Sequence, residues 1–209
     1  MRSTLARQTS AGLRLLLAMT VLTGILYPLA VWGVTRLPGL VGNAEGSIIT
    51  HHGSPVGSEL IGIDLVDPRA RADPALDRYF HTRPSASAKT PLGPGDPATT
   101  GGSNLAADSR ALLAAVQERK QAIALREAVA PQQVPADAVT ASASGVDPQI
   151  SPDYAHLQVP RVARNNGLPE QQVRAIVDAR TRGRDGGFLG DLAVNVLQLN
   201  LAVAEAAHS

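Results

Sequence analysis

The histidines of this sequence are the first residues whose chemistry must be weighed. His51 and His52 are adjacent, and imidazole nitrogens are common ligands of zinc. Adjacent residues point to different sides of the backbone, however, and no acidic or histidine partner follows them at helical spacing. We therefore interpret the pair as solvated and expect no metal site. We expect His81 and His156 to be isolated and solvated in the same way.

A glycine-rich stretch, residues 92–106, invites comparison with phosphate-binding loops. The P-loop pattern GxxxxGK[ST] needs a lysine directly after its glycines, because the ammonium group reaches the β- and γ-phosphates. Here no lysine follows, and Lys89 precedes the glycines at the wrong spacing. Ser87 and Lys89 could be imagined as a nucleophile and its base, but their loop offers no framework for an oxyanion. We expect a structural loop, no catalytic residue and no assignable cofactor-binding residue.

The stretch TASASGVDPQISPDYA, residues 140–155, carries hydroxyls and carboxylates but no histidine, lysine or arginine. Nothing in it would activate a nucleophile. Gly145 allows a tight turn, Asp147-Pro148 favours another, and Ser151-Pro152 is typical of a helix start. We interpret the stretch as a surface shaped by backbone turns, whose small side chains let another surface approach closely.

Composition excludes several classes of function. The chain has 209 residues and a formal net charge of +1, which gives no strong attraction for nucleic acid. It contains no cysteine, so disulfides, thiolate metal sites and cysteine nucleophiles are absent. One group of basic residues is concentrated in the last third, and we expect it to form a solvated helix face or to contact anionic headgroups or an acidic partner. Its members are Arg161, Arg164, Arg174, Arg180, Arg182 and Arg184.

The elements that must position these residues begin with an uncharged run from Leu15 to Val34. As a helix, it would span roughly 30 Å, the thickness of a bilayer core. A cleaved signal peptide would have a shorter apolar region and a better cleavage site. We therefore predict a retained transmembrane helix over residues 13–34.

Charges at the two ends of this helix indicate its orientation. Arg2, Arg7 and Arg14 precede the apolar run, whereas Arg36 alone follows it closely. The positive-inside rule then places residues 1–12 in the cytoplasm and residues 35–209 outside. Within the helix, residues 20–24 include two threonines and a glycine, which either form a packing face or are incidental.

Past the helix, turn residues separate short β-prone and longer helix-prone segments. Strands are expected at residues 47–50 and 59–65, and residues 64–78 are expected to form a surface loop. Helices are expected from an N-cap at Asp108 to residue 128, from Ser151-Pro152 to residue 165, and after Pro169. The last apolar stretch, residues 194–203, fits both periods, and we favour a helix. The predicted fold is α+β, with one N-terminal transmembrane helix followed by a single compact extracytoplasmic domain.

Eight stretches, in order, resemble the C chain of the Kdp-type potassium-transporting ATPase. Together they cover almost the whole chain, and their order makes the resemblance specific although each is weak alone. They are TGILYPLAVWG (23–33), GSII (46–49), GSELIG (57–62), YFHTRPSA (79–86), GGSNL (101–105), TASASGVDPQIS (140–151), QVPRVAR (158–164) and GFLGDLAVNVLQLNLA (187–202).

The resemblance implies a single-span, non-catalytic subunit of a potassium import pump in the bacterial inner membrane. Its implied partners are a potassium-selecting channel-like chain (KdpA), an ATP-hydrolysing chain (KdpB), a small chain (KdpF) and membrane lipid, with no nucleic acid. The family is described as a catalytic chaperone that raises ATP affinity, so ATP binding is implied as well. The residues themselves favour assembly over direct nucleotide binding, because an outer domain could not meet cytoplasmic ATP. The alternative is a membrane-anchored extracytoplasmic hydrolase or binding protein unrelated to transport.

Overall fold

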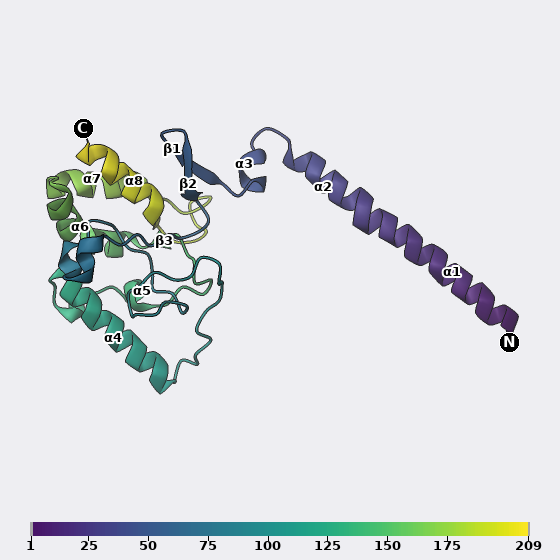
Figure 1. The fold of residues 1–209 in the computed structure, drawn as a ribbon, viewed down its shortest axis with the longest axis horizontal. Coiled ribbons are helices and arrows are strands. Elements are labelled where there is room, and N and C mark those ends of the chain that lie inside the picture. The colour runs from purple at the N-terminus through teal and green to yellow at the C-terminus, as the bar shows by residue number, and fades with distance from the viewer. Residues whose placement is uncertain (1, 209) are drawn as a thin grey trace. The chain divides into compact units, whose positions relative to one another are not determined.

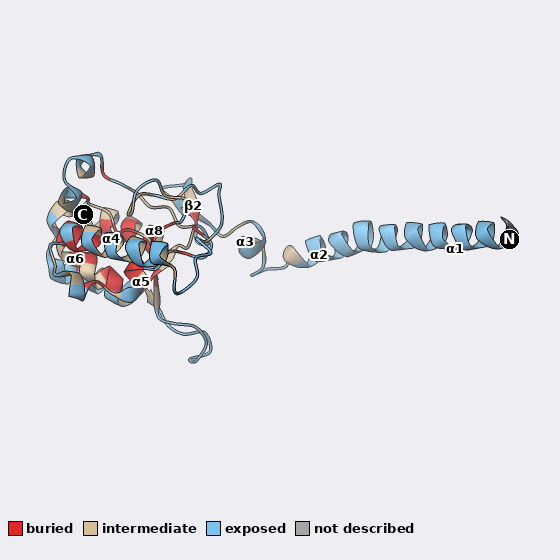
Figure 2. Cartoon of the chain, turned by 90° about the horizontal axis from the view of Figure 1, so that it is seen from below, coloured by how far each residue is buried: buried red, intermediate tan, exposed pale blue. Residues whose placement is uncertain are grey.

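The computed structural model describes residues 2–208, which fall into two units that divide after Ser47. The first unit is mainly one long helix, drawn purple in Figure 1. Its parts are α1 (Arg2–Val21), a π-helical turn (Leu22–Leu26) and α2 (Tyr27–Thr35), and the short α3 (Val41–Ala44) follows. The stretch Ser3–Thr35 is long and apolar enough to cross a membrane. Large apolar side chains are exposed along the whole length of this helix, which is pale blue in Figure 2.

The π-helical turn has a local cause. Pro28 lies in the first turn of α2, and in a regular α-helix a proline ring clashes with the carbonyl four residues earlier, here that of Gly24. A π-helical turn is wider than an α-helical one and is the usual form of a bulge within a long helix. The turn directly before Pro28 therefore carries the helix past the proline without ending it.

The second unit mixes helices with two small antiparallel sheets, which confirms the expected combination of helices and strands. The first sheet is the hairpin of β1 (Ile48–His51) and β2 (Ser54–Ser58). The second has the order β3 (Gln149–Ile150), β5 (Ala193–Asn195) and β4 (Thr181–Arg182). The helices are α4 (Arg110–Glu127), α5 (Ala136–Val139), α6 (Pro152–Asn166), α7 (Glu170–Arg180) and α8 (Val196–Ala207).

The hydrophobic core is built around α6. Its buried residues Val159 and Val162 lie among the buried valines of α7 and the apolar face of α8, and Ile123 of α4 joins the same cluster. The ends of α6 follow its sequence. The Ser151 hydroxyl accepts a hydrogen bond from the Tyr154 N–H at 3.0 Å, and Gly167 ends the helix in the left-handed conformation. The start predicted at Ser151-Pro152 is confirmed.

Three sequence expectations for the elements need correction. The second strand covers Ser54–Ser58 and not residues 59–65, because a tight turn at His52-Gly53 folds the chain back earlier than expected. The N-cap of α4 is Ser109 and not Asp108. The stretch 64–78 is not simply a surface loop, since it contains two short 3₁₀ turns and the buried carboxylates of Asp67 and Asp77.

The C-terminal stretch contains both of the structures between which its pattern was ambiguous. Residues 193–195 form the central strand β5, and α8 begins directly afterwards with Asn195 as its N-cap. The Asn195 side chain accepts a hydrogen bond from the Gln198 N–H at 3.1 Å, which fixes the point of change. The favoured helix is thus confirmed, and the alternating Leu197, Leu199 and Leu201, which would suit a strand, lie within α8.

Candidate functional site

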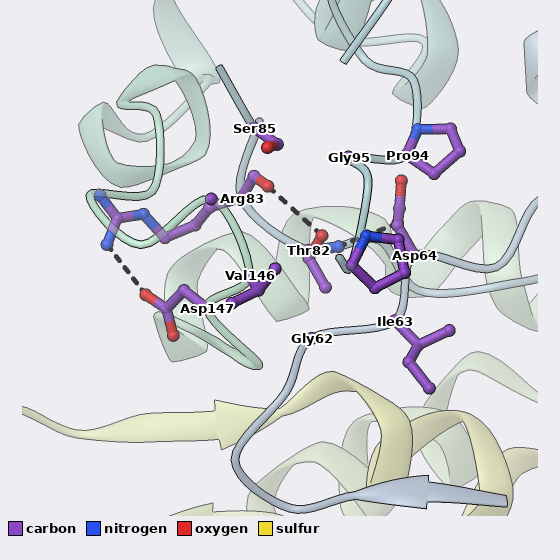
Figure 3. A pocket seen from close by; sticks show the side chains of 12 residues that line it. Gly62, Ile63, Asp64, Thr82, Arg83, Ser85, Pro94, Gly95, Val146 and Asp147 are labelled. Carbon is purple, nitrogen blue, oxygen red and sulfur yellow. Dashed lines mark hydrogen bonds and ion pairs between the residues drawn. The ribbon is translucent and has the colours of Figure 1, made fainter. Parts of the chain in front are cut away.

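Loops far apart in the sequence meet around a small cavity of about 130 Å³ (Figure 3). It is lined by residues 62–64, 82, 83, 85, 94, 95, 97 and 145–147. The Arg83 guanidinium donates to the Asp147 carboxylate at 3.2 Å across one side. On the other side, Asp64 Oδ1 accepts from the Thr82 N–H at 3.2 Å. Backbone groups and paired charges thus form this site, and no activated nucleophile is seen among its lining residues.

The stretch 140–155 supplies one wall of this assembly. The Ser142 hydroxyl is buried and accepts the backbone N–H groups of Gly145 at 2.9 Å and Asp147 at 3.2 Å. The backbone N–H of Ser142 donates to the Pro84 carbonyl at 2.8 Å, and the Gly101 N–H donates to the Ser144 carbonyl at 2.8 Å. The expected close approach of another surface therefore occurs, and the surfaces in contact are loops of the same chain.

Glycine is required where these loops touch. Gly145 adopts φ +76°, and a Cβ there would lie 3.0 Å from the Gly101 carbonyl oxygen. A Cβ at Gly95 would lie 2.5 Å from the Ser85 side chain. The glycine-rich stretch thus packs against residues 85 and 140–145, which supports its interpretation as a structural loop. The Ser87 hydroxyl forms a hydrogen bond with Ser85 Oγ and accepts another from the Asp96 N–H. Within the described part of the chain, no hydrogen bond joins it to Lys89.

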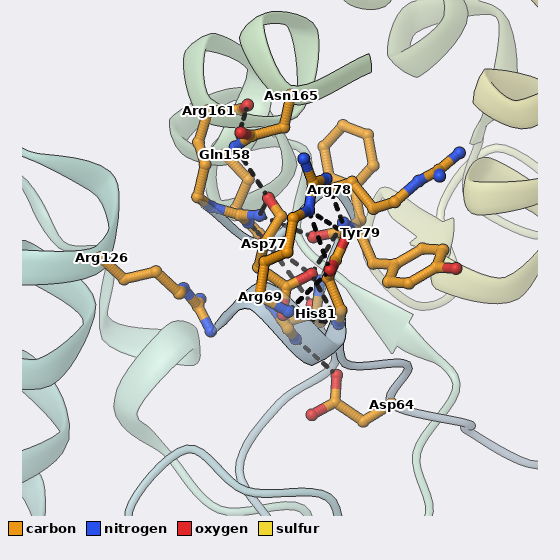
Figure 4. Close-up of polar contacts among 12 residues, drawn as sticks. Asp64, Arg69, Asp77, Arg78, Tyr79, His81, Arg126, Gln158, Arg161 and Asn165 are labelled. Atoms are coloured by element: carbon orange, nitrogen blue, oxygen red, sulfur yellow. Dashed lines mark hydrogen bonds and ion pairs between the residues drawn. The ribbon is translucent and has the colours of Figure 1, made fainter. Parts of the chain in front are cut away.

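A network of buried charges joins α4 and α6. Figure 4 shows two of its members, Arg126 and Arg161, with the segment around Asp77 and His81. Glu127 accepts a hydrogen bond from Arg126 Nε at 2.7 Å and from Arg161 Nε at 2.9 Å, and all three side chains are buried. Arg126 also donates to the Tyr154 hydroxyl at 2.8 Å. Arg161 is 1% exposed, so the expectation that it belongs to a solvated helix face is wrong for this member.

Arg161 connects α6 to the irregular segment that follows the two 3₁₀ turns. Its Nη1 atom donates to the backbone carbonyls of Asp77 at 2.6 Å and Tyr79 at 2.8 Å. One turn earlier, Gln158 accepts the His81 N–H at 2.8 Å and donates to the His81 carbonyl at 3.3 Å. Two side chains of one helix thus replace the strand partner that this extended segment lacks.

His81 is enclosed by carboxylates, so the expectation of an isolated, solvated histidine is wrong. Its Nδ1 atom lies 3.0 Å from Asp64 Oδ1, and its Nε2 atom lies 3.4 Å from Asp77 Oδ2. The ring is 4% exposed. Asp64 is 17 residues away in irregular backbone, so no sequence period could have indicated the pairing.

The charges set the protonation of the two buried carboxylates. Burial by itself raises the pKa of Glu127, but the guanidinium groups of Arg126 and Arg161 outweigh it and hold that pKa below its usual range. Burial likewise opposes ionisation of Asp77, and His81, the Tyr79 N–H and Arg161 together bring its pKa below the ordinary value. Both groups are therefore carboxylates at neutral pH, and their partners are cations and N–H groups.

The remaining candidates lie apart from this network. His51 Nδ1 is 3.5 Å from Glu205 Oε1, and His52 forms the turn of the β1–β2 hairpin. His156 contacts Asp178 at 3.1 Å, so it is not isolated. Residues 2–208 contain no cluster of three metal-ligating acids or histidines, and the absence of a metal site remains a prediction. Five arginines of the basic group are exposed as expected: Arg164, Arg174, Arg180, Arg182 and Arg184.

An exposed apolar hairpin between β4 and β5 was missed by the sequence analysis. Asp185 and Leu189 form a β-bridge, and Phe188 is 73% exposed at the tip beside the exposed Leu189 and Leu192. Ion pairs of Arg182 with Asp185 at 2.7 Å and of Arg184 with Asp191 at 3.6 Å flank it. In the sequence, the signal for this tip is a pair of large apolar residues between glycines, Gly187-Phe188-Leu189-Gly190.

Comparison with known proteins identifies relatives along nearly the whole chain. The family model "K+-transporting ATPase, c chain" matches residues 9–205. The potassium-transporting ATPase KdpC subunit of Kineococcus radiotolerans is 47% identical over 97% of this chain and 96% of its own length. Those of Streptomyces coelicolor and Bradyrhizobium diazoefficiens are 46% and 41% identical, over 96% of this chain and over 93% and 98% of their own lengths.

Removing the charge of Glu127 should unfold the domain readily. In Glu127→Gln, two buried guanidinium groups lose their counter-charge, and we expect a loss of about 3–5 kcal/mol in the free energy of unfolding. Urea unfolding of the full chain in detergent micelles measures this. Glu118→Gln, an exposed change on the same helix, should alter it by less than about 0.5 kcal/mol. Similar values for the two variants would contradict a central role for the ion pair.

The depressed pKa values of Asp77 and Glu127 predict loss of stability in acid. Their contribution is fully present above the unfolded-state values of about 4 and is lost as pH falls through the lower folded-state values. We therefore expect the free energy of unfolding to decrease as pH is lowered from about 5 to 2. Asp77→Asn should flatten this pH dependence, and an unchanged slope in that variant would exclude Asp77 as a source.

Proposed function

This chain belongs to the family of K⁺-transporting ATPase c chains, and we propose that within that complex it is a non-catalytic subunit that supports assembly. The match across residues 9–205 carries the proposal, because it places both units of the chain within the family. The paired state of the buried charges supports it, since Glu127 and Asp77 serve to hold segments of the domain together.

The proposed topology has one membrane span at residues 13–34, residues 1–12 in the cytoplasm and residues 35–209 outside the bacterial inner membrane. The arginines that precede the apolar run support this orientation. The one arginine that closely follows it, Arg36, is paired with Glu45 at 2.6 Å and lies over the Trp32 ring. Tryptophan is enriched at membrane–water interfaces, so Trp32 supports a helix end at this position.

The proposed partners are the channel-like, ATP-hydrolysing and small chains of the pump. Two surfaces support partner contacts, namely the exposed apolar helix and the hairpin tip at Phe188 and Leu189. Large apolar residues on a monomer surface are typical of sites where another chain or a lipid binds. We propose that the outer domain covers the extracytoplasmic mouth of the potassium-selecting chain and that the hairpin tip contacts it. Because the sequence has no P-loop, the proposal rests on assembly and not on ATP binding by this chain.

Affinity purification from membranes of potassium-limited cells tests the assignment. The tagged full chain should co-purify with a K⁺-stimulated ATPase. Phe188→Asp should reduce the recovered ATPase about tenfold or more, because a charge at the tip would have to be buried in the contact. Leu113→Asp, at an exposed leucine of α4, should leave recovery unchanged. Purification of the parent chain alone would exclude the proposed function.

Single cysteines test the topology cleanly, because the chain has none of its own. A membrane-impermeant maleimide added to intact spheroplasts should label Ser103→Cys, in an exposed loop of the second unit. Thr4→Cys should react only after the membrane is permeabilised. The reverse pattern would place the domain in the cytoplasm and overturn the proposed orientation.

A further inference from the structure

A second, larger cavity lies between α4 and two loops, residues 66–77 and 90–94. Its volume is about 440 Å³, within the range of small-molecule sites. Most of its wall is apolar, and the residues that matter here are Val66, Pro74, Pro91, Leu92, Ala122 and Leu125. Leu125 is 74% exposed at the edge of the cavity, although it lies on a helix whose opposite face is in the core.

The wall opposite α4 is held rigidly. Asp67 and Asp73 cap the two 3₁₀ turns of residues 68–71 and 74–76 through their side chains. The Asp77 carboxylate in turn accepts the Asp67 N–H at 3.2 Å and the Tyr79 N–H at 3.0 Å. The cavity is therefore formed before any ligand binds, which limits the entropy lost on binding.

Among the polar groups of this cavity, the arginines have N–H donors that no described residue uses. His81 Nε2 is buried and lies 3.4 Å from Asp77 Oδ2, so it faces that carboxylate and is not available to a ligand. Arg126 uses Nε and Nη2 for Glu127 and Tyr154, and no described residue accepts a bond from its Nη1. Arg71 lines the cavity, is exposed and makes no ion pair with any described residue. Asp77, the one carboxylate of the lining, is already occupied by N–H donors.

From this arrangement we propose that the cavity binds an apolar monocarboxylate. The ring or short chain of the ligand packs against Leu92, Ala122 and Leu125, and its carboxylate accepts hydrogen bonds from Arg126 and Arg71. Guanidinium–carboxylate bonds are charge-assisted and are stronger than those of a neutral amide in the same position. The site lies outside the small cavity of Figure 3 apart from the shared Pro94, and the inference does not depend on the proposed function.

A ¹⁹F label on a single cysteine reports the site in the full chain, held in phospholipid nanodiscs. Thr90→Cys places the label at the exposed edge of the cavity, and Leu113→Cys places a control label on α4 outside it. The probe is 3-phenylpropionate, and its neutral counterpart is 3-phenylpropanamide. We expect a saturable shift at position 90 only, with the acid binding about tenfold more tightly than the amide.

Two further variants separate the apolar wall from the charge. Ala122→Phe fills the cavity and should abolish the shift, whereas Ala114→Phe, exposed on the same helix, should not. Arg71→Gln should lower the affinity for the acid about threefold or more and leave the affinity for the amide unchanged. Equal affinities for acid and amide, the absence of a saturable shift, equal shifts at positions 90 and 113, or an unaffected Ala122→Phe variant would each overturn the proposal.

Discussion

The buried contact of Glu127 with Arg161 is the constraint on which the rest of the domain depends. A charged group removed from water requires a partner of opposite charge and hydrogen bonds for its remaining donors. Arg161 meets this requirement by binding Glu127 on α4 and the carbonyls of residues 77 and 79. One side chain thereby fixes the positions of two helices and of an irregular segment at the same time.

The irregular segment then determines the loops around it. With its backbone held by Arg161 and Gln158, the segment places His81 between the carboxylates of Asp64 and Asp77. The loop after it presents Pro84 and Ser85 to residues 142–145, and small side chains allow that contact. The hydroxyl-rich stretch 140–155 therefore serves packing, since the hydroxyls of Ser142, Ser144 and Ser151 accept backbone N–H groups of their own turns.

The paired charges of the interior contrast with the surfaces of the chain. The N-terminal helix and the hairpin tip at Phe188 expose large apolar side chains, and the cavity beside α4 combines apolar walls with unused N–H donors. Family membership and these surfaces both support the proposed role in assembly. The hairpin supports a role in assembly, and the cavity adds a site that assembly alone does not require.

The sequence by itself determined the membrane-length helix, the start of α6 at Ser151, the mixture of helices and strands, and the family. These features depend on local composition, capping residues and ordered motifs, which are readable along one chain. It did not determine the burial of Arg161, the setting of His81, the position of β2 or the apolar cavity. Those features depend on residues such as Glu127 and Asp64 that become neighbours only when irregular loops pack against α4 and α6. Tertiary structure decided them because irregular backbone has no period from which the partner of a buried charge could be predicted.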